Sequence, residues 1–495
     1  MANQYLLGID NGNTVTKAAL FDLRGRELYV ASRSADTIQP YPGWTERSMD
    51  TLWSNTAQAI RELIQRAGIS GGEIAAVGCT GHGNGLYLLD KSFKSCRNAV
   101  QSMDTRASDI LRDWEANHLR ERVAAYTPQE TYTGQTVVLL AWLKRHEPET
   151  YAQIGKVLLC KDYINYCLTG ELVSDYTDIS GANLFDVYNR CYSPELLALF
   201  GIPEIEDALP PMKASAEVIG RVTQQAAEAT GLAAGTPVIA GMLDTHASAI
   251  GAGVCRPGQA CIVVGTWSIN QIVLKEPLRS TDLFLMQPFA DSRYWLAMEA
   301  SATSASNLEW FVNQFCADER MEAQRRGISV YDVCNEAVAS IPAEESSVIF
   351  LPFLYSANLP AGFHGLAGWH TRAHALRAVY EGIAFSHLAH IEKLRRAGAS
   401  FEKARLTGGG ARSAVWGQMF ADLLGMSMEI PDGFETGTRG AALAAGVGAK
   451  IYADFDEAVS AAVSLARTHE PDPHNTPIYQ QRYEEYKQLV TRLAS

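Results

Sequence analysis

Long apolar runs are missing from this 495-residue chain. No stretch of about 18 apolar residues is free of charge, and this excludes a membrane-spanning helix. The N-terminal residues also lack a basic segment followed by a long apolar core, so we expect neither a signal peptide nor a membrane anchor. These absences predict a soluble protein with no membrane partner.

Positive charge is scarce as well. The chain has 42 lysines and arginines against 55 aspartates and glutamates, which gives a net charge of −13. Such a chain offers no general electrostatic attraction to nucleic acid, and we predict no nucleic-acid partner. If it binds a polyanion such as ATP, backbone amides and a metal ion must supply the positive potential.

Cysteines are few, and their pattern is not that of a disulfide framework. Their number, nine, is odd, and no CxxC pair occurs. We therefore predict free thiols and a cytoplasmic location, where thiols stay reduced. With 47% apolar and 20% charged residues, the composition is that of an ordinary globular protein.

Two common nucleotide-binding signatures, GxxxxGK[ST] and a GxGxxG that follows a strand, are also absent. What the chain contains instead is an alternation of strand and helix patterns. Residues 5–9 and 15–21 predict a hairpin, residues 50–67 have apolar residues at helical spacing, and residues 74–79 predict another strand. This alternation predicts an α/β fold with a substantial sheet.

The second half of the chain begins in a similar way. Residues 237–240 predict a strand and residues 244–252 a helix, and two further strands, 260–264 and 269–274, flank a short turn. We interpret this as a structural duplication, although similar hairpins also arise independently. Glycine, proline and arginine interrupt the pattern near residues 251–258, so we divide the chain into domains 1–250 and 251–495.

Three turns have the composition of phosphate-binding loops. The first runs from Asp10 to Lys17, the second is Gly265-Thr266-Trp267-Ser268, and the third contains Gly408-Gly409-Gly410. Small residues in a tight turn expose backbone N–H groups that can hold phosphate oxygens, and an aspartate at a strand end can hold Mg²⁺. Taken alone, the first two turns are better explained as ordinary hairpin turns.

Asp244 lies where a predicted strand meets a predicted helix. An aspartate at this position can cap the helix, because its carboxylate accepts hydrogen bonds from the first free backbone amides. It can also act as a general base in a substrate cleft. The residue pattern by itself favours the cap.

Taken in order, these motifs resemble those of the FGGY family of carbohydrate kinases over nearly the whole chain. The resemblance rests on segments spread from the N-terminus to the last third of the chain: Gly8-Ile9-Asp10-Asn11-Gly12, Pro42-Gly43-Trp44-Thr45-Glu46, Asp104-Thr105-Arg106, Lys161-Asp162-Tyr163, Leu168-Thr169-Gly170, Gly241-Met242-Leu243-Asp244, Gly265-Thr266-Trp267-Ser268 and Gly408-Gly409-Gly410-Ala411. It implies two actin-like, ribonuclease H-like ATPase domains with a cleft between them. It also implies transfer of the γ-phosphate of ATP, with Mg²⁺, to a sugar hydroxyl.

The resemblance assigns roles to individual residues. Asp244 becomes the catalytic base and Asp10 the Mg²⁺ ligand. Domain 1–250 would hold the sugar and the first phosphate loop, and domain 251–495 the second phosphate loop and the adenosine. The remaining assignments are Asn13, Thr14 and Lys17 in the first phosphate loop, Gly265 and Thr266 in the second, Gly409, Gly410 and Ser413 at the adenosine, and His82, Asp104, Trp44 and Tyr132 with Asp244 around the sugar.

Within the family, three segments are most similar to bacterial L-xylulose kinases, which are also described as 3-keto-L-gulonate kinases: residues 80–86, 265–267 and 307–311. One difference concerns His82, which stands where those enzymes have glutamine. Because imidazole and amide present different hydrogen-bonding groups, D-xylulose, D-ribulose and erythritol remain open as substrates beside L-xylulose.

Two other functional classes share the fold. A sugar or nucleotide sensor would need no base, so Asp10, Lys17 and Asp244 favour an enzyme. An actin-like or chaperone-type ATPase would need no sugar site, so Trp44, His82 and Asp104 favour a sugar kinase. The expected partners are a small sugar and ATP, with a homodimer as the family-level expectation for assembly.

Overall fold

The computed structural model describes residues 4–280, 283–355, 359–433 and 435–494. The chain folds into two compact units. The first contains Met1–Pro257, Val273–Ala297 and Glu435–Val463, and the second contains Gly258–Ile272, Met298–Phe434 and Ser464–Ser495. The predicted domains were each one continuous segment, whereas the first unit also takes up two segments from the second half of the chain.

The first unit is built on a seven-stranded sheet with the order β13-β14-β5-β1-β2-β3, in which β15 also pairs with β5. The predicted hairpin is present: β1 (Tyr5–Asn11) and β2 (Val15–Asp22) are antiparallel, and Gly12 N–H donates to the Val15 carbonyl at 3.0 Å. β3 (Glu27–Ser34) extends the hairpin. On its other side β1 runs parallel to β5 (Ile74–Gly81), which runs parallel to β14 (Pro237–Ile239) and β15 (Met242–Leu243).

Helix α1 (Met49–Ala67) confirms the predicted helical spacing. Ser48 caps its N-terminus by accepting from Thr51 N–H, and Gly68, in the left-handed conformation at φ 66°, ends it. Its apolar face, including Leu52, Ile60 and Leu63, is buried in the core beside β2 and β3.

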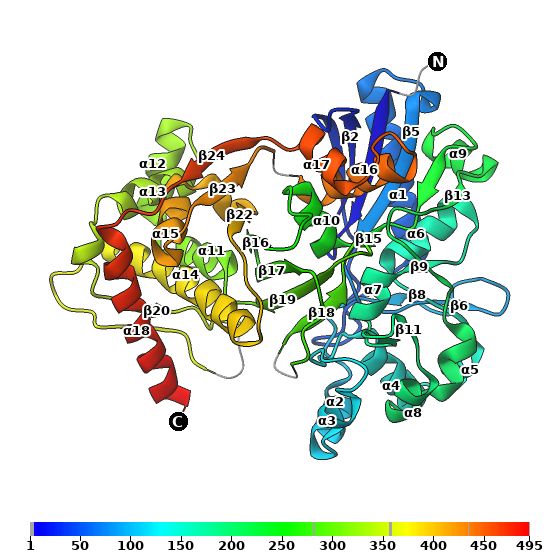
Figure 1. Ribbon diagram of the computed structural model, residues 1–495, viewed down its shortest axis with the longest axis horizontal. Helices are drawn as coiled ribbons and strands as arrows, with labels where there is room; N and C mark the ends of the chain where they lie inside the picture. Colours follow the sequence, from blue (N-terminus) through cyan, green and yellow to red (C-terminus); the bar gives the residue numbers. More distant parts are fainter. Residues whose placement is uncertain (1–3, 281–282, 356–358, 434, 495) are drawn as a thin grey trace. The chain divides into compact units, whose positions relative to one another are not determined.

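Helix α16 (Thr436–Gly448) packs against β1 and β5, and in Figure 1 its orange ribbon lies beside the blue strands. The approach is close enough that a Cβ atom on Gly8 would overlap the Thr438 carbonyl oxygen. α16 also packs against α10 (Asp244–Gly251), where a Cβ atom on Gly440 would overlap the Ala247 carbonyl oxygen. Glycine is therefore required at both contacts.

The second unit contains most of a second large sheet, in which β17, β16, β22, β23 and β24 are neighbours in this order. β16 (Gln259–Val264) and β17 (Ser268–Leu274) form the second predicted hairpin. β16 then runs parallel to β22 (Lys403–Thr407), as β1 runs parallel to β5 in the first unit. The two sheets thus share a hairpin followed by a parallel strand, which supports the interpretation as a duplication.

The other elements complete the two units. The further helices of the first unit are α2 (Ser108–Ala116), α3 (Leu119–Val123), α4 (Thr136–His146), α5 (Pro148–Gln153), α6 (Cys160–Thr169), α7 (Tyr176–Gly181), α8 (Pro194–Leu199), α9 (Gln224–Thr230) and α17 (Phe455–Ala462). Those of the second are α11 (Ala305–Phe315), α12 (Ala317–Arg326), α13 (Val330–Ala339), α14 (Arg372–Arg396), α15 (Ala414–Leu424) and α18 (Asn475–Ala494).

The remaining strands are mostly short. They are β4 (Glu46–Arg47), β6 (Tyr87–Asp90), β7 (Ala99–Val100), β8 (Ile154–Leu158), β9 (Ser174–Asp175), β10 (Phe185–Asp186), β11 (Cys191–Tyr192), β12 (Met212–Lys213), β13 (Val218–Arg221), β18 (Leu285–Pro288), β19 (Trp295–Ser301), β20 (Ile349–Leu351), β21 (Gly362–His364), β23 (Met428–Pro431) and β24 (Leu465–His469). Among the described residues, no helix is both long and apolar enough to span a bilayer.

Candidate active site

Asp10 and Asp244 lie at the same edge of the first sheet. Asp10 is near the end of β1 and pairs with Thr80 of β5, while Met242 of β15 pairs with Thr80 from the other side. Because these strands are parallel, their carboxyl ends meet at one edge. The sheet therefore brings together two aspartates that are far apart in the sequence.

Both carboxyl groups have pKa values well above the usual range. Burial and the nearby charge of Asp10 together raise the pKa of Asp244 to about 7, against a hydrogen bond from Thr245 N–H that lowers it. Burial also raises the pKa of Asp10 to about 6, while Lys17 opposes the rise and Glu435 adds to it. A carboxyl group with a pKa close to neutrality is suited to accept a proton from a substrate hydroxyl.

Asp244 is the first residue of α10, and Leu243 occupies the cap position without a side-chain cap. The carboxylate is thus not the N-cap that one interpretation of the sequence expected. Its side chain is partly exposed, as is that of Asp10, so a ligand can reach both.

The first predicted phosphate loop lies between β1 and β2. Lys17 is paired with Asp10 across the hairpin, and its ammonium contacts both oxygens of Glu435, at 2.7 and 2.9 Å. Asn13 donates to Ser102 Oγ at 3.1 Å, and Arg47 donates to its carbonyl at 2.7 Å. Thr14 is exposed. The loop is thus anchored at Asn13, and Lys17 is held near Asp10 by an acidic partner.

His82 follows β5 and is only 3% exposed. Its Nδ1 lies 3.3 Å from the Gly83 carbonyl, which can only accept, so we assign the proton to Nδ1. Its Nε2 then accepts from Tyr87 Oη at 2.8 Å. Burial and the nearby Arg47 lower the pKa of His82 to about 3, so the ring is neutral. His82 directly follows Gly81, which pairs with Asn11 and Leu243, and both of its ring nitrogens have protein partners.

Tyr132 lies close to Asp244. Burial and the charge of Asp244 raise the pKa of its hydroxyl, which hydrogen-bonds to Asn84. Its ring stacks on Phe284 with centroids 6.3 Å apart. Tyr132 therefore contributes an aromatic face and a neutral hydroxyl to the surroundings of Asp244.

Asp104 and Trp44 belong to a separate polar cluster in the first unit. Asp104 is fully buried, and its two carboxylate oxygens accept from the Arg106 guanidinium, from Arg106 N–H and from Thr45 N–H at 2.6–2.9 Å. The Arg106 guanidinium also lies 4.1 Å from the centroid of the Trp44 ring and binds Glu46. Asp104 therefore helps to hold the segment that contains Trp44 and Thr45 in place.

The predicted nucleotide residues come together in the second unit. Gly265, Thr266, Gly409, Gly410 and Ser413 line one cavity of about 570 Å³. Gly408 has φ 85°, and a Cβ atom on Gly410 would overlap the Val264 side chain. The glycines therefore allow a tight turn against the end of β16 and leave the cavity open.

The cavity also includes residues that the sequence did not single out. Asn335 of α13 accepts from Ser413 Oγ at 2.7 Å and from Tyr380 Oη at 3.0 Å. Tyr331 and Asp332 of α13 lie on the same lining. No local signal marks these helical residues, because only the packing of α13 against α14 and α15 brings them to the glycine turn.

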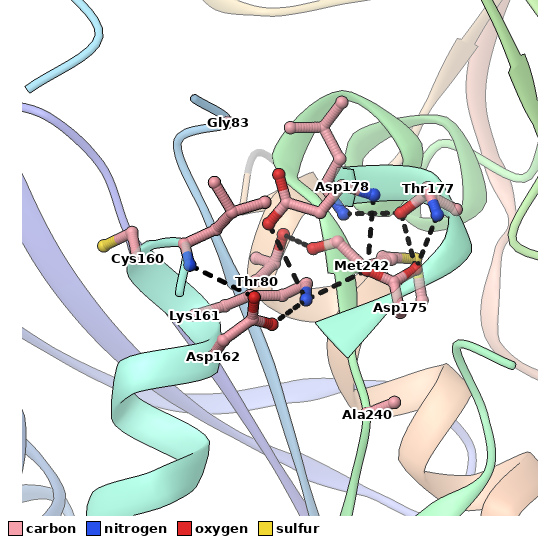
Figure 2. A network of polar contacts seen from close by, with 12 residues as sticks. Thr80, Gly83, Cys160, Lys161, Asp162, Asp175, Thr177, Asp178, Ala240 and Met242 are labelled. Carbon is pink, nitrogen blue, oxygen red and sulfur yellow. Dashed lines mark hydrogen bonds and ion pairs between the residues drawn. The ribbon is translucent and has the colours of Figure 1, made fainter. Parts of the chain in front are cut away.

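A second group that sequence reasoning did not assign surrounds Lys161, known there only as part of a family motif. In Figure 2 the Lys161 ammonium lies among three carboxylates, those of Asp162, Asp175 and Asp178. The distances are 2.5, 2.9 and 3.6 Å, and all four side chains are fully buried. Lys161 also lies against the segment that leads to Asp244, because a Cβ atom on Gly241 would be 3.4 Å from its side chain.

The residues around Asp10 suit a hydrated Mg²⁺ ion. No described residue donates a side-chain hydrogen bond to its carboxylate, and no described group of three or more His, Cys, Asp or Glu side chains could hold a metal by itself. Mg²⁺ keeps much of its water shell and usually takes one or two carboxylates together with substrate phosphates. A single accessible carboxylate therefore fits the ion.

Both halves of the chain match known protein families. Residues 5–251 match the model of the N-terminal domain of the FGGY family of carbohydrate kinases, and residues 260–449 match that of the C-terminal domain. The L-xylulose/3-keto-L-gulonate kinase of Escherichia coli is 41% identical over 99% of this chain and 97% of its own. A probable L-xylulose kinase of Pasteurella multocida is 39% identical over 99% of both chains.

Solved structures show the same likeness. The crystal structure of xylulose kinase from Rhodospirillum rubrum superimposes with a TM-score of 0.90, at 29% identity and 99% coverage of both chains. A second structure, described as a xylulose kinase of Brucella ovis, gives a TM-score of 0.87 at 28% identity, with the same coverage.

Proposed function

Because this chain belongs to the FGGY family of carbohydrate kinases and is an ATP-dependent sugar kinase, we propose that its substrate is L-xylulose. The observation that carries this proposal is the identity of 37–41% to curated proteins named L-xylulose kinases, over 99% of this chain. D-Xylulose is the second candidate, because the similar solved structures are described as xylulose kinases.

Asp244 is the catalytic base in this proposal. Phosphoryl transfer depends mainly on positioning and on charge neutralisation, with a carboxylate that accepts the proton of the attacking hydroxyl. The support for Asp244 is its partly exposed side chain at the carboxyl ends of β1, β5 and β15, together with a pKa of about 7. In this proposal Tyr132 and His82 line the sugar, and Trp44 and Asp104 support that region from a neighbouring cluster.

Asp10 holds Mg²⁺ in this proposal, and the ion, when bound, offsets negative charge on the phosphates of ATP. Lys17, Asn13 and Thr14 contribute the first phosphate loop. Gly265 and Thr266 donate to phosphate in the second unit, and Gly409, Gly410 and Ser413 form the floor of the adenosine site. The support for this last assignment is the shared cavity of about 570 Å³.

Release of ADP, measured with a coupled assay against about twenty ketoses, polyols and sugar acids, tests the substrate. We expect the highest kcat/KM for L-xylulose. A higher value for D-xylulose, D-ribulose or erythritol would replace L-xylulose, and sugar-independent ADP release would favour a partner-driven ATPase. ATP binding without turnover on any sugar would favour a sensor.

Two further properties belong to the proposal. We infer a cytoplasmic location, because ATP is the substrate and all nine cysteines are free thiols. The homodimer stays a prediction, and the mass of the protein in solution tests it.

A further inference from the structure

The backbone that leads into Asp244 is held by side chains of the first unit. Thr80 Oγ1 donates to the Met242 carbonyl at 2.7 Å, and Asn165 Nδ2 donates to the Ala240 carbonyl at 2.8 Å. Leu243 N–H, immediately before Asp244, donates to Thr177 Oγ1 at 2.9 Å. Of these three hydrogen bonds, only the one to Thr177 is made by the residue adjacent to the proposed base.

Thr177 is itself oriented by a buried carboxylate. Its hydroxyl donates to Asp175 Oδ2 at 2.7 Å, which leaves an oxygen lone pair to accept Leu243 N–H. Asp175 also accepts from Thr177 N–H and from Ser215 Oγ, both at 2.9 Å. The direction of the hydroxyl is therefore set by Asp175.

Asp175 is in turn fixed by Lys161, whose ammonium lies 2.9 Å from Asp175 Oδ1. Burial opposes the charge on Lys161, but Asp162, Asp175 and Asp178 raise its pKa overall, so the ammonium is charged. Neither oxygen of Asp178 has a hydrogen-bond partner, and burial raises its pKa well above the usual range. The other two carboxylates, Asp162 and Asp175, lie closer to the ammonium, at 2.5 and 2.9 Å, and Asp175 leads to the active site.

We propose that Thr177, oriented by the Lys161–Asp175 ion pair, is a positioning residue that sets the location of the Asp244 carboxylate. This inference rests on the proposed role of Asp244 as the base. Figure 2 shows the arrangement, with Thr177 and Asp175 on one side of the ammonium and Asp162 on the other. Thr177, Asp175 and Lys161 are fully buried. Their contacts connect α6 and α7 to the start of α10.

This series of contacts from Lys161 to Leu243 predicts a specific kinetic defect. Thr177→Val has nearly the same shape as threonine but removes the oxygen that accepts Leu243 N–H. The base should then move by a fraction of an ångström, and displacements of about 1 Å can lower a rate by about 100-fold. We expect kcat to fall by about 10- to 100-fold, with KM for sugar and for ATP within about threefold of wild type.

Thr230→Val is the matched control. Thr230 is also fully buried in the first unit, and its hydroxyl also donates to one oxygen, that of Ala226 at 2.7 Å, and accepts one backbone amide, that of Leu232 at 3.2 Å. Its loss should lower the melting temperature without changing kcat. Thr177→Ser, which keeps the hydroxyl, should recover kcat to within about threefold of wild type.

The series overturns the proposal if Thr177→Val keeps kcat within about twofold, or if Thr177→Ser is as defective as Thr177→Val. Equal kcat losses in Thr177→Val and Thr230→Val would show that Thr177 contributes to the stability of the fold and not to the position of Asp244. Lys161→Met should lower kcat as well, and a folded Lys161→Met variant with normal kcat would show that Lys161 does not act on Asp244 through Asp175. An active Asp244→Asn enzyme, by contrast, would contradict the base assignment itself.

Discussion

At the scale of single residues, Asp244 carries the mechanism. Asp244→Asn keeps the size of the side chain and removes the charge that accepts the proton. General-base catalysis typically contributes about 10²–10⁴-fold, so we expect kcat to fall at least about 100-fold. Affinity for ATP–Mg²⁺ should change by less than about threefold, and the melting temperature should not fall. Near-normal turnover would show that another group takes the proton, with Asp10 and Asp104 the next to test.

The same residue predicts how the rate depends on pH. Because burial and Asp10 raise the pKa of Asp244 to about 7, the folded enzyme holds a proton there below that pH. A protonated carboxyl cannot accept the substrate proton, so kcat/KM should rise with pH through an acid limb near pH 7. A profile from about pH 5 to 9 measures it. A flat profile, or a rate that increases as the pH falls, would contradict the assignment.

His82 is the residue at which this chain differs from the expected glutamine. Its ring nitrogens are occupied by Tyr87 and the Gly83 carbonyl, so His82→Gln changes the turn as well as any sugar contact. We expect the ratio of kcat/KM for L-xylulose and D-xylulose to change by about tenfold or more, because sites that hydrogen-bond a hydroxyl discriminate strongly. Tyr87→Phe is the control for the turn. An equal change in kcat/KM for both sugars would show that His82 has a structural role only.

At the scale of elements, α16 and α10 determine where Asp244 lies relative to β1. Gly440→Ala would place a Cβ atom onto the Ala247 carbonyl, and neither helix can yield without moving away from the sheet. We expect a loss of stability of about 3 kcal/mol, together with lower kcat because α10 begins at Asp244. In Gly72→Ala, the control, the added Cβ is 3.7 Å from its nearest neighbour. Equal melting temperatures for the two variants would contradict this account of the packing.

At the scale of the whole molecule, net charge governs how ATP is held. A chain with a charge of −13 has few cations to offer the phosphates, and Lys17 is already paired with Glu435. ATP turnover should therefore require Mg²⁺, and Asp10→Asn should raise the Mg²⁺ concentration for half-maximal rate by about tenfold or more. Titration of the rate with Mg²⁺ measures this. Turnover in EDTA would contradict it.

Much of the fold follows from local patterns. Apolar runs on either side of short turns predicted both hairpins, and helical spacing over residues 50–67 predicted α1 almost to the residue. The family resemblance, carried by short motifs in a fixed order, is confirmed over both halves of the chain. These features depend on neighbouring residues or on residue identity, so a sequence reveals them directly.

Other features exist only once the chain is folded. The proximity of Asp10 and Asp244 requires β15 to pair with β5, and the hydrogen bond from Thr80 to Met242 spans 162 positions. The return of α16 to the first sheet, the buried ion pairs of Lys161 and the approach of Asn335 to Ser413 likewise join distant segments. By itself the sequence determined the family, the hairpins and the candidate aspartate. Only long-range packing decided which groups surround that aspartate and hence its raised pKa, because burial and neighbouring charge are properties of the folded chain.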